Sequence, residues 1–564
     1  MPFRFMASLG LASVLILPTA CQSEDDGEGP EVEAQIDAAP SEFDGRLEPD
    51  VGPSVIDVGV EPDQMLSPDM QVDATPEAPD GEVADELDGG LPDASPDDAT
   101  LDARVPDMGA QPDAMPPTFE GPREVIVHLF EWRWDAIADE CEMVLGPGGY
   151  RAVQVSPPQE YGLIEGHPWW ERYQPVSYQL AGRSGDADAF DDMVRRCADA
   201  GVEIMVDAVI NHMAFSQGPG VAGTEFERYR YPGLYEDEHF HQCRRGIENW
   251  GDRFEIHHCE LATLPDLATG HPHVRQQLTA YLQDLLDRGV AGFRVDAAKH
   301  MPAVDLAAIF DAVDGDPYVF QEVVDTHDGE VVTAEEYFGI GRITEFRYGL
   351  EITRVFTEGQ LSWLSGFGEA WGMVPSEQAV VFIDNHDTQR GHGVGDPITH
   401  RVPDLYRVAN VFMLAWPYGH PKVMSSYAIR GGDHGPPRDA EGATTRPPRG
   451  GDCSDGWICE HRWPDVMAMV RFRSATTGAP VSRWWSNGND QIAFAREGRG
   501  YVIINREEAP TITRFFDTGL APGRYCDVLA DSCDVPIEVN GDGWAEITIG
   551  PLDAVALHVE AMAP

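Results

Sequence analysis

The stretch GVAGFRVDAAKHM, residues 289–301, decides the fold because it joins a predicted helix to a buried strand. Just upstream, in HPHVRQQLTAYLQDLLDRG, apolar residues recur on one helical face. Pro272 suits the first turn of this helix, and Gly289 suits a left-handed C-cap. The run GFRVD then has the short apolar character of a strand that is buried on both faces. A helix that leads directly into such a strand is typical of a β/α repeat.

Seven further apolar runs, separated mostly by amphipathic stretches, repeat this pattern along the chain. They are EVIVHLF (124–130), YRAVQVS (150–156), GVEIMVDAVI (201–210), PYVFQEV (317–323), RITEFRYG (342–349), AVVFIDNHD (379–387) and KVMSSY (422–427). Eight strands alternating with helices predict an α/β fold, a (β/α)8 TIM barrel. We assign residues 119–210 and 267–479 to this barrel.

Two segments interrupt or follow the barrel pattern. The connection between VINHM and PDLATG is too long for an ordinary βα loop, so residues 211–266 are predicted to form a small inserted domain after the third strand. From residue 480 the chain reads as short alternating strands with Gly-rich turns. Residues 480–564 therefore predict a separate C-terminal antiparallel β domain, a β-sandwich of Greek-key type.

The N-terminal segment carries an export signature. Arg4, the apolar run LGLASVLIL and the small residues of PTAC precede Cys21. Residues 1–20 resemble a bacterial lipoprotein signal peptide, in which Cys21 is the lipidated residue; an ordinary signal peptide cut nearby is the alternative. We expect an exported protein, either anchored by lipid to a membrane, at the outer membrane or cell surface, or secreted.

The next segment has a composition that opposes folding. Residues 22–118 hold 28 Asp and Glu against two Arg, with 14 Pro and one aromatic residue, Phe43. Such a chain cannot bury enough apolar surface, so residues 21–118 are predicted to be a disordered, acidic, Pro/Asp-rich tether. The formal net charge of the whole chain is -58, which makes nucleic acid an unfavourable partner because phosphates repel it.

The cysteine count agrees with export. The chain has nine cysteines, and lipidation of Cys21 leaves eight, an even number suited to four disulfides in an oxidising compartment. None has zinc-finger spacing, and CSDGWIC and CDVLADSC have the form of short stapled loops. A thiol catalyst is therefore not expected.

Polar residues cluster where the predicted strands end, which is where a barrel of this kind places its chemistry. They are Asp207, Asn211 and His212 after the third strand, Arg294 and Asp296 in the fourth, Glu322 in the fifth, and Asn385, His386 and Asp387 in the seventh. Several acids on one rim favour glycoside hydrolysis, in which one acid protonates the leaving oxygen and another attacks the sugar. The alternative is that each acid is a structural cap or ion-pair partner.

Ten motifs together resemble one known family. HLFEWRWDAIADECE, VQVSPP, PWWERYQPVSYQLAGRSG, VDAVINHM, GVAGFRVDAAKHM, FQEV, GRITEF, FIDNHDTQRGHG, PYG with VMSSY, and WICEHRW stand in the order found in animal-type, chloride-dependent α-amylases of glycoside hydrolase family 13. The likeness runs from about residue 122 to the C-terminus. It implies endo-hydrolysis of α-1,4 bonds in starch, glycogen and malto-oligosaccharides by a monomeric enzyme.

The resemblance implies a role for each acid. Asp296 is the expected nucleophile, Glu322 the general acid/base, and Asp387 the acid that holds and distorts the substrate, with retention of anomeric configuration. Expected substrate contacts come from Trp169, Trp170, Tyr173, Gln174, His212, Lys299, His300, His386 and His392. Two alternatives stay open: a related maltogenic hydrolase or glucanotransferase, and a non-catalytic starch-binding surface lipoprotein.

The resemblance also implies two ions. Calcium is expected on Asn211 and Asp266 together with the backbone carbonyls of His257 and His300. Chloride is expected on Arg294, Asn385 and Lys422, with Lys422 standing where the animal enzymes usually carry Arg. A chloride near Glu322 would disfavour its ionised form. We therefore expect Arg294 to support Asp296 through chloride rather than to form a simple ion pair with it.

The same resemblance implies four disulfides. The expected pairs are Cys141 with Cys197, Cys243 with Cys259, Cys453 with Cys459, and Cys526 with Cys533.

Overall fold

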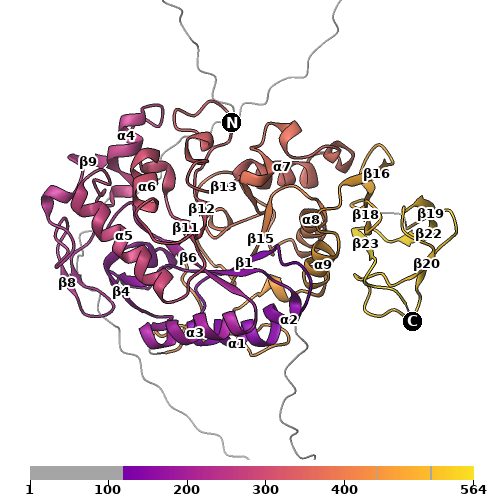
Figure 1. The fold of residues 1–564 in the computed structure, drawn as a ribbon, viewed down its shortest axis with the longest axis horizontal. Helices are drawn as coiled ribbons and strands as arrows, with labels where there is room; N and C mark the ends of the chain where they lie inside the picture. Colours follow the sequence, from indigo (N-terminus) through magenta and orange to yellow (C-terminus); the bar gives the residue numbers. More distant parts are fainter. Residues whose placement is uncertain (1–118, 441, 509–510, 564) are drawn as a thin grey trace, which may run out of the picture. The chain divides into compact units, whose positions relative to one another are not determined.

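Eight parallel strands close into a barrel at the centre of the fold (Figure 1). The structure is a computed structural model that describes residues 119–440, 442–508 and 511–563, so the predicted signal peptide, the tether and Cys21 lie outside the described residues. In chain order the barrel strands are β1 (Ile126–Leu129), β2 (Ala152–Val155), β6 (Glu203–Ala208), β11 (Gly292–Val295), β12 (Tyr318–Gln321), β13 (Arg342–Thr344), β14 (Ala379–Val381) and β15 (His420–Ser425).

The strands follow one another around the barrel, and β15 pairs with β1 to close it. In the register of the ladder, Arg294 of β11 is opposite Asp207 of β6 on one side and Phe320 of β12 on the other. All carboxyl ends therefore lie on one rim, which is where the expected acids stand.

Helices pack outside the barrel strands, which confirms the predicted β/α alternation. They are α1 (Trp134–Glu140), α2 (Gly146–Gly148), α3 (Ala187–Asp199), α5 (Pro272–Asp287), α6 (Ala303–Phe310), α7 (Phe346–Thr357), α8 (Pro403–Ala415) and α9 (Pro464–Ala475). Helix α5 begins at Pro272, and Gly289 just after it has a φ of 99°, as the sequence predicts. Between β12 and β13 the repeat lacks an α-helix; a 3-10 turn at Ala334–Tyr337 takes its place.

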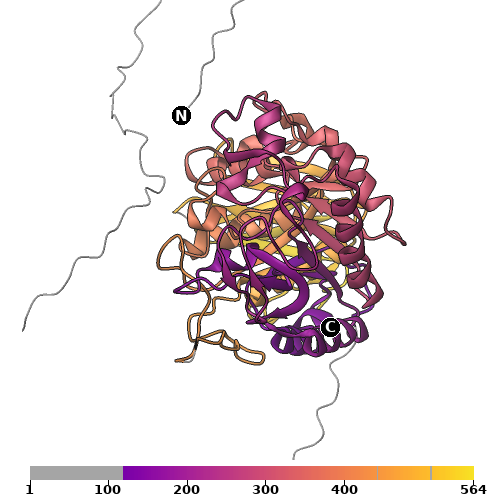
Figure 2. The ribbon, with the colours of Figure 1, turned by 90° about the vertical axis from the view of Figure 1, so that its left-hand side faces the viewer.

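The long connection after β6 forms an insertion of short elements. It contains β7 (Gly218–Pro219), β8 (Glu225–Phe226), β9 (Cys243–Gly246), α4 (Arg253–His258) and β10 (Cys259–Glu260). Figure 2 views the barrel from the side on which these segments lie. The insertion meets a second small sheet that the sequence did not predict, made of β3 (Gln159–Tyr161), β4 (Pro175–Gly182) and β5 (Gly185–Asp186). The amide of Ala214 donates to the Pro175 carbonyl at 2.9 Å and so joins the two.

The C-terminal residues form two four-stranded antiparallel sheets, as predicted. One sheet has the order β16-β17-β18-β23 and the other β19-β22-β21-β20, in which β20, β21 and β22 are successive neighbours and β19 returns beside β22, a Greek-key order. Their bounds are β16 (Val481–Ser486), β17 (Gln491–Arg496), β18 (Gly500–Asn505), β19 (Ile512–Asp517), β20 (Gly523–Tyr525), β21 (Ile537–Val539), β22 (Trp544–Ile549) and β23 (Asp553–His558).

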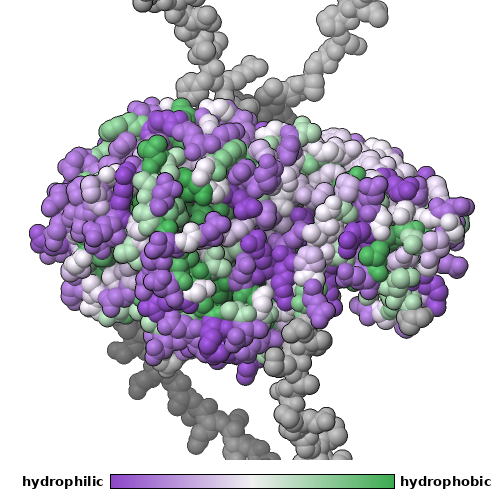
Figure 3. Space-filling view, in the orientation of Figure 1, coloured by the Kyte–Doolittle hydropathy of each residue, from purple (hydrophilic) through white to green (hydrophobic). Residues whose placement is uncertain are grey.

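Four disulfides tie the described chain together, and they join the pairs that the resemblance implies: Cys141–Cys197, Cys243–Cys259, Cys453–Cys459 and Cys526–Cys533. Figure 3 shows hydrophilic residues over much of the visible face, with apolar side chains between them. Among the described residues, no helix combines the length and apolarity that a membrane span requires.

Candidate active site

One buried guanidinium organises the rim of the barrel. Arg294 is 2% exposed, and its Nη1 lies 2.6 Å from Asp207 Oδ1 and 2.6 Å from Asp296 Oδ1. Its Nη2 lies 2.7 Å from Glu322 Oε1. Arg294 and Asp296 therefore contact each other directly, but not as a simple mutual ion pair. Because β6, β11 and β12 are neighbours, three carboxylates reach one cation, and the ion pair is shared rather than mutual.

The acids at this rim are electrostatically coupled. Burial raises the pKa of Asp296 well above its usual range, and the charges of Glu322, Asp207 and Asp387 raise it further, while Arg294 opposes them. Burial also raises the pKa of Asp387 to about 7, with Glu322 adding to the shift. Since the groups interact, their protons belong to the cluster rather than to single residues. Strongly perturbed acids in one buried cluster are typical of a catalytic site.

Backbone contacts hold the first two acids in place. The ladder continues past the strand ends, with the Asp296 amide donating to the Ala208 carbonyl at 3.0 Å and the Glu322 amide to the Val295 carbonyl at 2.9 Å. Ala297 has a φ of 49°, a left-handed conformation unusual for a residue with a Cβ. In that conformation its amide donates to Glu322 Oε2 at 2.8 Å, which fixes the carboxylate beside Asp296.

Asp387 is held by the turn that follows β14. The Asn385 side-chain oxygen accepts hydrogen bonds from the amides of Asp387 at 3.0 Å and Thr388 at 2.8 Å. His386 Nε2 lies 3.4 Å from Asp387 Oδ2. Burial lowers the pKa of His386 well below its usual range, so its imidazole is neutral at neutral pH.

Aromatic side chains form a wall beside these acids. The Tyr173 hydroxyl donates to Asp207 Oδ2 at 2.9 Å, and its ring stacks on His386 with a centroid distance of 5.3 Å. Trp169 lies edge-on to His386 at 5.5 Å and tilted toward His392 at 5.7 Å. The structure thus brings four of the predicted substrate residues together around the acids.

The remaining predicted substrate residues lie around this wall. His212 Nε2 contacts the Tyr173 carbonyl oxygen at 3.0 Å, and Gln174 Oε1 accepts from the Phe215 amide at 3.0 Å. Lys299 Nζ donates to the Val324 carbonyl, and its backbone amide donates to the Glu322 carbonyl oxygen. Trp170 is the most peripheral, because its indole N–H donates to Asp433 at 3.0 Å and its ring is half-buried.

Sequence reasoning missed Trp250, which the insertion supplies. Its side chain is 57% exposed, and its ring lies edge-on to His300 at 5.8 Å. His300 Nδ1 in turn contacts the Ile256 carbonyl of α4 at 3.1 Å. A single Trp in a polar stretch, IENWGD, gave no periodic pattern from which its place could be predicted. Arg390, whose guanidinium lies among three aromatic rings, was also missed.

Two of the predicted calcium residues, Asn211 and Asp266, meet where the insertion joins the barrel. Asp266 is 3% exposed, and the backbones of His212 and Asp266 form a bridge that places Asn211 beside it. Burial raises the pKa of Asp266 well above its usual range. His241 Nδ1 lies 2.6 Å from Asp266 Oδ2, and burial lowers the pKa of His241. Across the described residues, no Lys or Arg forms an ion pair with this buried carboxyl.

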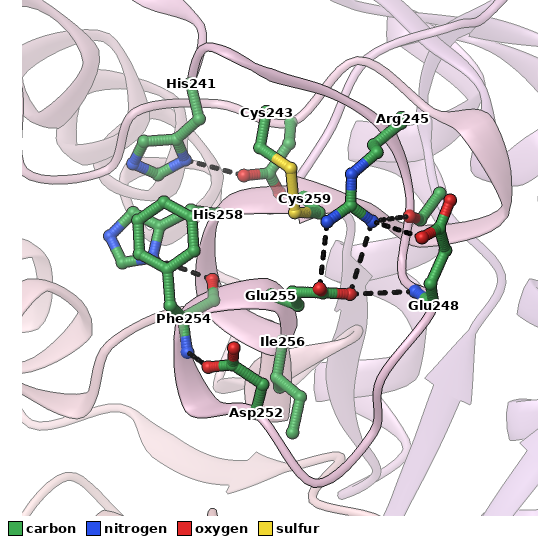
Figure 4. The surroundings of a disulfide bond; sticks show 12 residues. His241, Cys243, Arg245, Glu248, Asp252, Phe254, Glu255, Ile256, His258 and Cys259 are labelled. Atoms are coloured by element: carbon green, nitrogen blue, oxygen red, sulfur yellow. Dashed lines mark hydrogen bonds and ion pairs between the residues drawn. A yellow bond between two sulfur atoms is a disulfide. The ribbon is translucent and has the colours of Figure 1, made fainter.

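A disulfide and an ion pair brace the neighbouring loop. Figure 4 shows the Cys243–Cys259 disulfide with Arg245 facing Glu255, whose Oε1 lies 2.8 Å from Arg245 Nη2. Within the described residues, no group of three or more His, Cys, Asp or Glu side chains is arranged to hold a metal ion. His257 Nε2 is buried without a hydrogen-bond partner.

Comparison with known proteins identifies the family. Residues 171–328 match the family described as "Alpha amylase, catalytic domain", and residues 484–560 match "Alpha amylase, C-terminal all-beta domain". An α-amylase of Streptomyces violaceus is 46% identical over 449 residues, which cover 79% of this chain and 75% of the relative. The chain belongs to the α-amylase family. An α-amylase of Thermomonospora curvata, 47% identical over 463 residues, agrees, covering 78% of this chain and 74% of that relative.

Solved structures of the family support the same conclusion. Wild-type α-amylase I of the earthworm Eisenia fetida has a TM-score of 0.74 and 38% identity, and covers 79% of this chain and 99% of the relative. A variant of that enzyme, with the same TM-score and coverage, was solved as a complex with maltohexaose. The predicted enzyme class, an α-amylase among the glycoside hydrolases, is confirmed by these relatives.

Proposed function

We propose that this α-amylase cleaves internal α-1,4-glucosidic bonds of starch, glycogen and malto-oligosaccharides with retention of configuration. The observation that carries the proposal is the gathering of Asp296 and Glu322 on one guanidinium, beside Asp387 and the aromatic wall. The maltohexaose complex of the earthworm relative supports the substrate class.

In the proposed reaction, Asp296 attacks the anomeric carbon while Glu322 protonates the departing glycosidic oxygen. A glycosyl–Asp296 ester forms, and Glu322 then takes a proton from the water that hydrolyses it. Asp387 and neutral His386 hydrogen-bond the sugar hydroxyls in the same subsite, and Tyr173 and Trp169 pack against the ring. Arg294 disperses the negative charge that the three acids concentrate here.

Replacing the nucleophile tests the enzyme proposal. We expect Asp296→Asn to lower kcat for soluble starch by several orders of magnitude, about 4 kcal/mol or more of barrier, because the amide cannot form the ester. Asp305→Asn is the matched control, since Asp305 pairs with Arg275 away from the acid cluster. Near-normal release of reducing ends by Asp296→Asn would contradict the assignment of Asp296 as the nucleophile. Proton NMR of the first product checks retention, and cyclic or lengthened products would favour a glucanotransferase.

We propose that Asn211 and Asp266 hold calcium together with the carbonyls of His257 and His300. The donor chemistry fits, because two hard oxygen side chains meet and the buried Asp266 carboxyl pairs with no Lys or Arg of the described chain. Bound calcium would supply the charge that joins the insertion to the barrel. These residues would hold it without taking part in bond cleavage.

Calcium removal tests this site by stability as well as by activity. Chelation should lower the thermal midpoint of the wild type, and added Ca²⁺ should restore it, because binding to the native state stabilises it by mass action. Asp266→Asn should show the low midpoint with or without Ca²⁺. Asp237→Asn, which alters an exposed acid of the insertion that pairs with Arg244, is the control and should keep the response.

We propose that chloride binds between Arg294, Asn385 and Lys422, which would make this an animal-type member of the family. Lys422 is 4% exposed; its Nζ donates to Gln154 Oε1 at 3.0 Å and lies over the rings of Phe320 and Phe382. Burial, followed by the charge of Arg294, lowers the pKa of Lys422 to about 8. An anion between these two cations would relieve their repulsion.

Chloride titration tests this proposal at constant ionic strength. Activity should rise with chloride when a larger anion replaces it in the reference buffer, and Lys422→Gln should lose the response. Because Lys offers one point charge instead of a bidentate fork, we expect chloride to be exchanged easily. A wild type that is fully active after exhaustive chloride removal would contradict the proposal.

We propose that the protein is exported and tethered by lipid at Cys21, with residues 21–118 as spacer, 119–210 and 267–479 as barrel, 211–266 as calcium-binding insertion and 480–564 as β-sandwich. The sequence LGLASVLILPTAC supports the anchor. Metabolic labelling with palmitate should mark the wild type, and Cys21→Ser should be unlabelled and release the enzyme into the medium. Labelling of Cys21→Ser would contradict lipidation at this residue.

A further inference from the structure

Arg390 is a buried cation enclosed by aromatic rings. It lies in the 3-10 turn Thr388–Arg390 after β14 and is 8% exposed. Its guanidinium carbon is 4.7 Å from the ring centroid of Phe130, 5.4 Å from that of Trp169 and 5.0 Å from that of Tyr427. Phe130, Trp169 and Tyr427 together form what we call the Arg390 cage. A desolvated cation held by ring faces is an energetically significant contact.

Few polar atoms of the described chain satisfy this guanidinium. Nη1 donates to the His386 carbonyl at 2.5 Å, whereas Nε and Nη2 are buried without a hydrogen-bond partner. No Asp or Glu of the described chain lies within ion-pair distance of it. Its charge is therefore not cancelled locally, and it acts on the nearby acids; the field of Arg390 favours the ionised form of Asp387. An incompletely satisfied buried group of this kind requires an explanation.

The Arg390 cage and the candidate active site have aromatic rings in common. Two cage rings, Phe130 and Trp169, also contact His386, at 5.0 and 5.5 Å between centroids. The Arg390 amide donates to the Asp387 carbonyl at 2.8 Å. The Arg390 side chain thus touches the His386 backbone and the rings that pack on the His386 imidazole, and the Arg390 backbone binds the turn that carries Asp387.

We propose that Arg390 is a positioning residue, which fixes the His386–Asp387 segment and presses the aromatic wall against it so that the reaction geometry is preformed. The inference rests on the proposed role of Asp387 in the amylase reaction. Arg390 acts through these residues and need not touch the sugar. A small displacement of a positioned group can cost about 100-fold in rate, so a large kinetic effect is expected without loss of folding.

The charge of Arg390 adds a second, independent readout. The charged or titratable groups around Asp387 are Glu322, Arg294, Asp296, Asp207, Tyr173, His386, His392, Lys422 and Arg390. Removing one cation from this cluster disfavours every ionised acid in it. The acidic and alkaline limbs of the pH profile of kcat/KM should therefore both move to higher pH when the charge is lost, whichever acid each limb reports.

The experiment compares Arg390→Met, Arg390→Lys and the control Arg401→Met on soluble starch, with kcat, KM, pH profile and thermal midpoint measured for each. Arg401 is a matched control because its Nη1 also donates to a backbone carbonyl of this turn, that of Gln389, at 3.0 Å, but it has no aromatic cage. We expect Arg390→Met to lose at least ~10-fold in kcat with the pH profile shifted upward. Arg390→Lys should lose kcat but keep the pH profile, and Arg401→Met should match the wild type.

The results that would contradict the positioning role of Arg390 differ from the result that would contradict the role of Asp387. If Arg390→Met folds, keeps kcat and keeps the wild-type pH profile, Arg390 is only a packing residue and the inference fails. If Arg390→Met fails to fold, Arg390→Lys decides, and wild-type kcat in that variant overturns the positioning role. Asp387→Asn serves as the reference for the proposed function: if it stays active, the role of Asp387 is wrong, whatever Arg390 does.

Discussion

Ala297 shows how a single residue prepares the site. It follows Asp296 directly, and its left-handed φ of 49° turns its amide toward Glu322 Oε2. A residue with a Cβ in this region carries strain of order 1–2 kcal/mol, and strain of this kind persists where the surrounding structure over-determines the backbone. The amide that directly follows Asp296 thus holds the carboxylate of Glu322, the second acid that is proposed to react.

Substitutions at this position should separate strain from function. Ala297→Gly should keep kcat within a few-fold, because Gly adopts the left-handed region without steric cost. Ala297→Val should lower kcat by ~10-fold or more, because a β-branched residue resists this conformation and would rotate the amide away from Glu322. Steady-state kinetics and the thermal midpoint check both variants, and a Val variant with normal kcat would show that this amide is not needed.

Sequence reasoning succeeded at residues whose type and strand position already limit their roles. Asp296, Glu322 and Asp387 follow apolar runs that can only be barrel strands, so their shared rim could be predicted. The partners of Arg294 could not, because the spacing of two residues puts Arg294 and Asp296 on one face but does not say which neighbouring strand also supplies an acid. Ala297 could not be predicted either, since its conformation is imposed by its surroundings.

At the scale of elements, the barrel strands were predictable because each is a buried apolar run. The short sheet β3–β4–β5 was not, because QEY and PVSYQLAG are polar or irregular and owe their pairing to the insertion packed beside them. The absence of an α-helix between β12 and β13 could not be predicted either, because THDGEVVTAEEYFG contains a helix-like acidic segment that forms only a 3-10 turn.

His420, the first residue of β15, makes the stability of the barrel depend on pH. His420 Nε2 accepts a hydrogen bond from Arg342 Nε at 3.2 Å, and burial, followed by the charge of Arg342, lowers the pKa of His420 to about 4. The unfolded chain takes up this proton near pH 6.5, before the folded chain does. The contribution of His420 is therefore fully present above about pH 6.5 and is lost as the pH falls toward 4.

We accordingly expect the thermal midpoint of His420→Gln to depend less on pH than that of the wild type. Gln can accept the Arg342 hydrogen bond but has no proton to take up, so the difference between the two proteins should shift in favour of the variant between pH 6.5 and 4. Midpoints measured by circular dichroism at several pH values test this. A constant difference across that range would show that His420 titrates normally in the folded protein.

At the scale of the whole molecule, disulfides differ in the length of chain they restrain. Cys141–Cys197 spans 56 residues and joins the end of α1 to α3, whereas Cys526–Cys533 spans 7 residues in the C-terminal domain. Chain-entropy arguments give ~4 kcal/mol for the longer loop and ~2 kcal/mol for the shorter. Both cysteines of the first pair are fully buried, so their removal also leaves a packing defect.

The double variant Cys141→Ala/Cys197→Ala should therefore lose more thermal stability than Cys526→Ala/Cys533→Ala. Scanning calorimetry of both variants, with starch hydrolysis as a check on folding at low temperature, makes the comparison. Equal midpoints would mean that loop length does not determine how much these disulfides contribute to thermal stability.

The shared ion pair at Arg294 has a consequence for the adaptability of the enzyme. Several acids with raised pKa values face one another around a single buried guanidinium, an arrangement that repels itself and opposes folding. A neutral amide in place of one of these acids would relieve part of that repulsion but abolish the proposed reaction, and activity and stability commonly compete in this way. Selection for heat resistance alone would then favour substitutions of these acids. Any effort to raise the thermal stability of this enzyme must therefore measure turnover at every round.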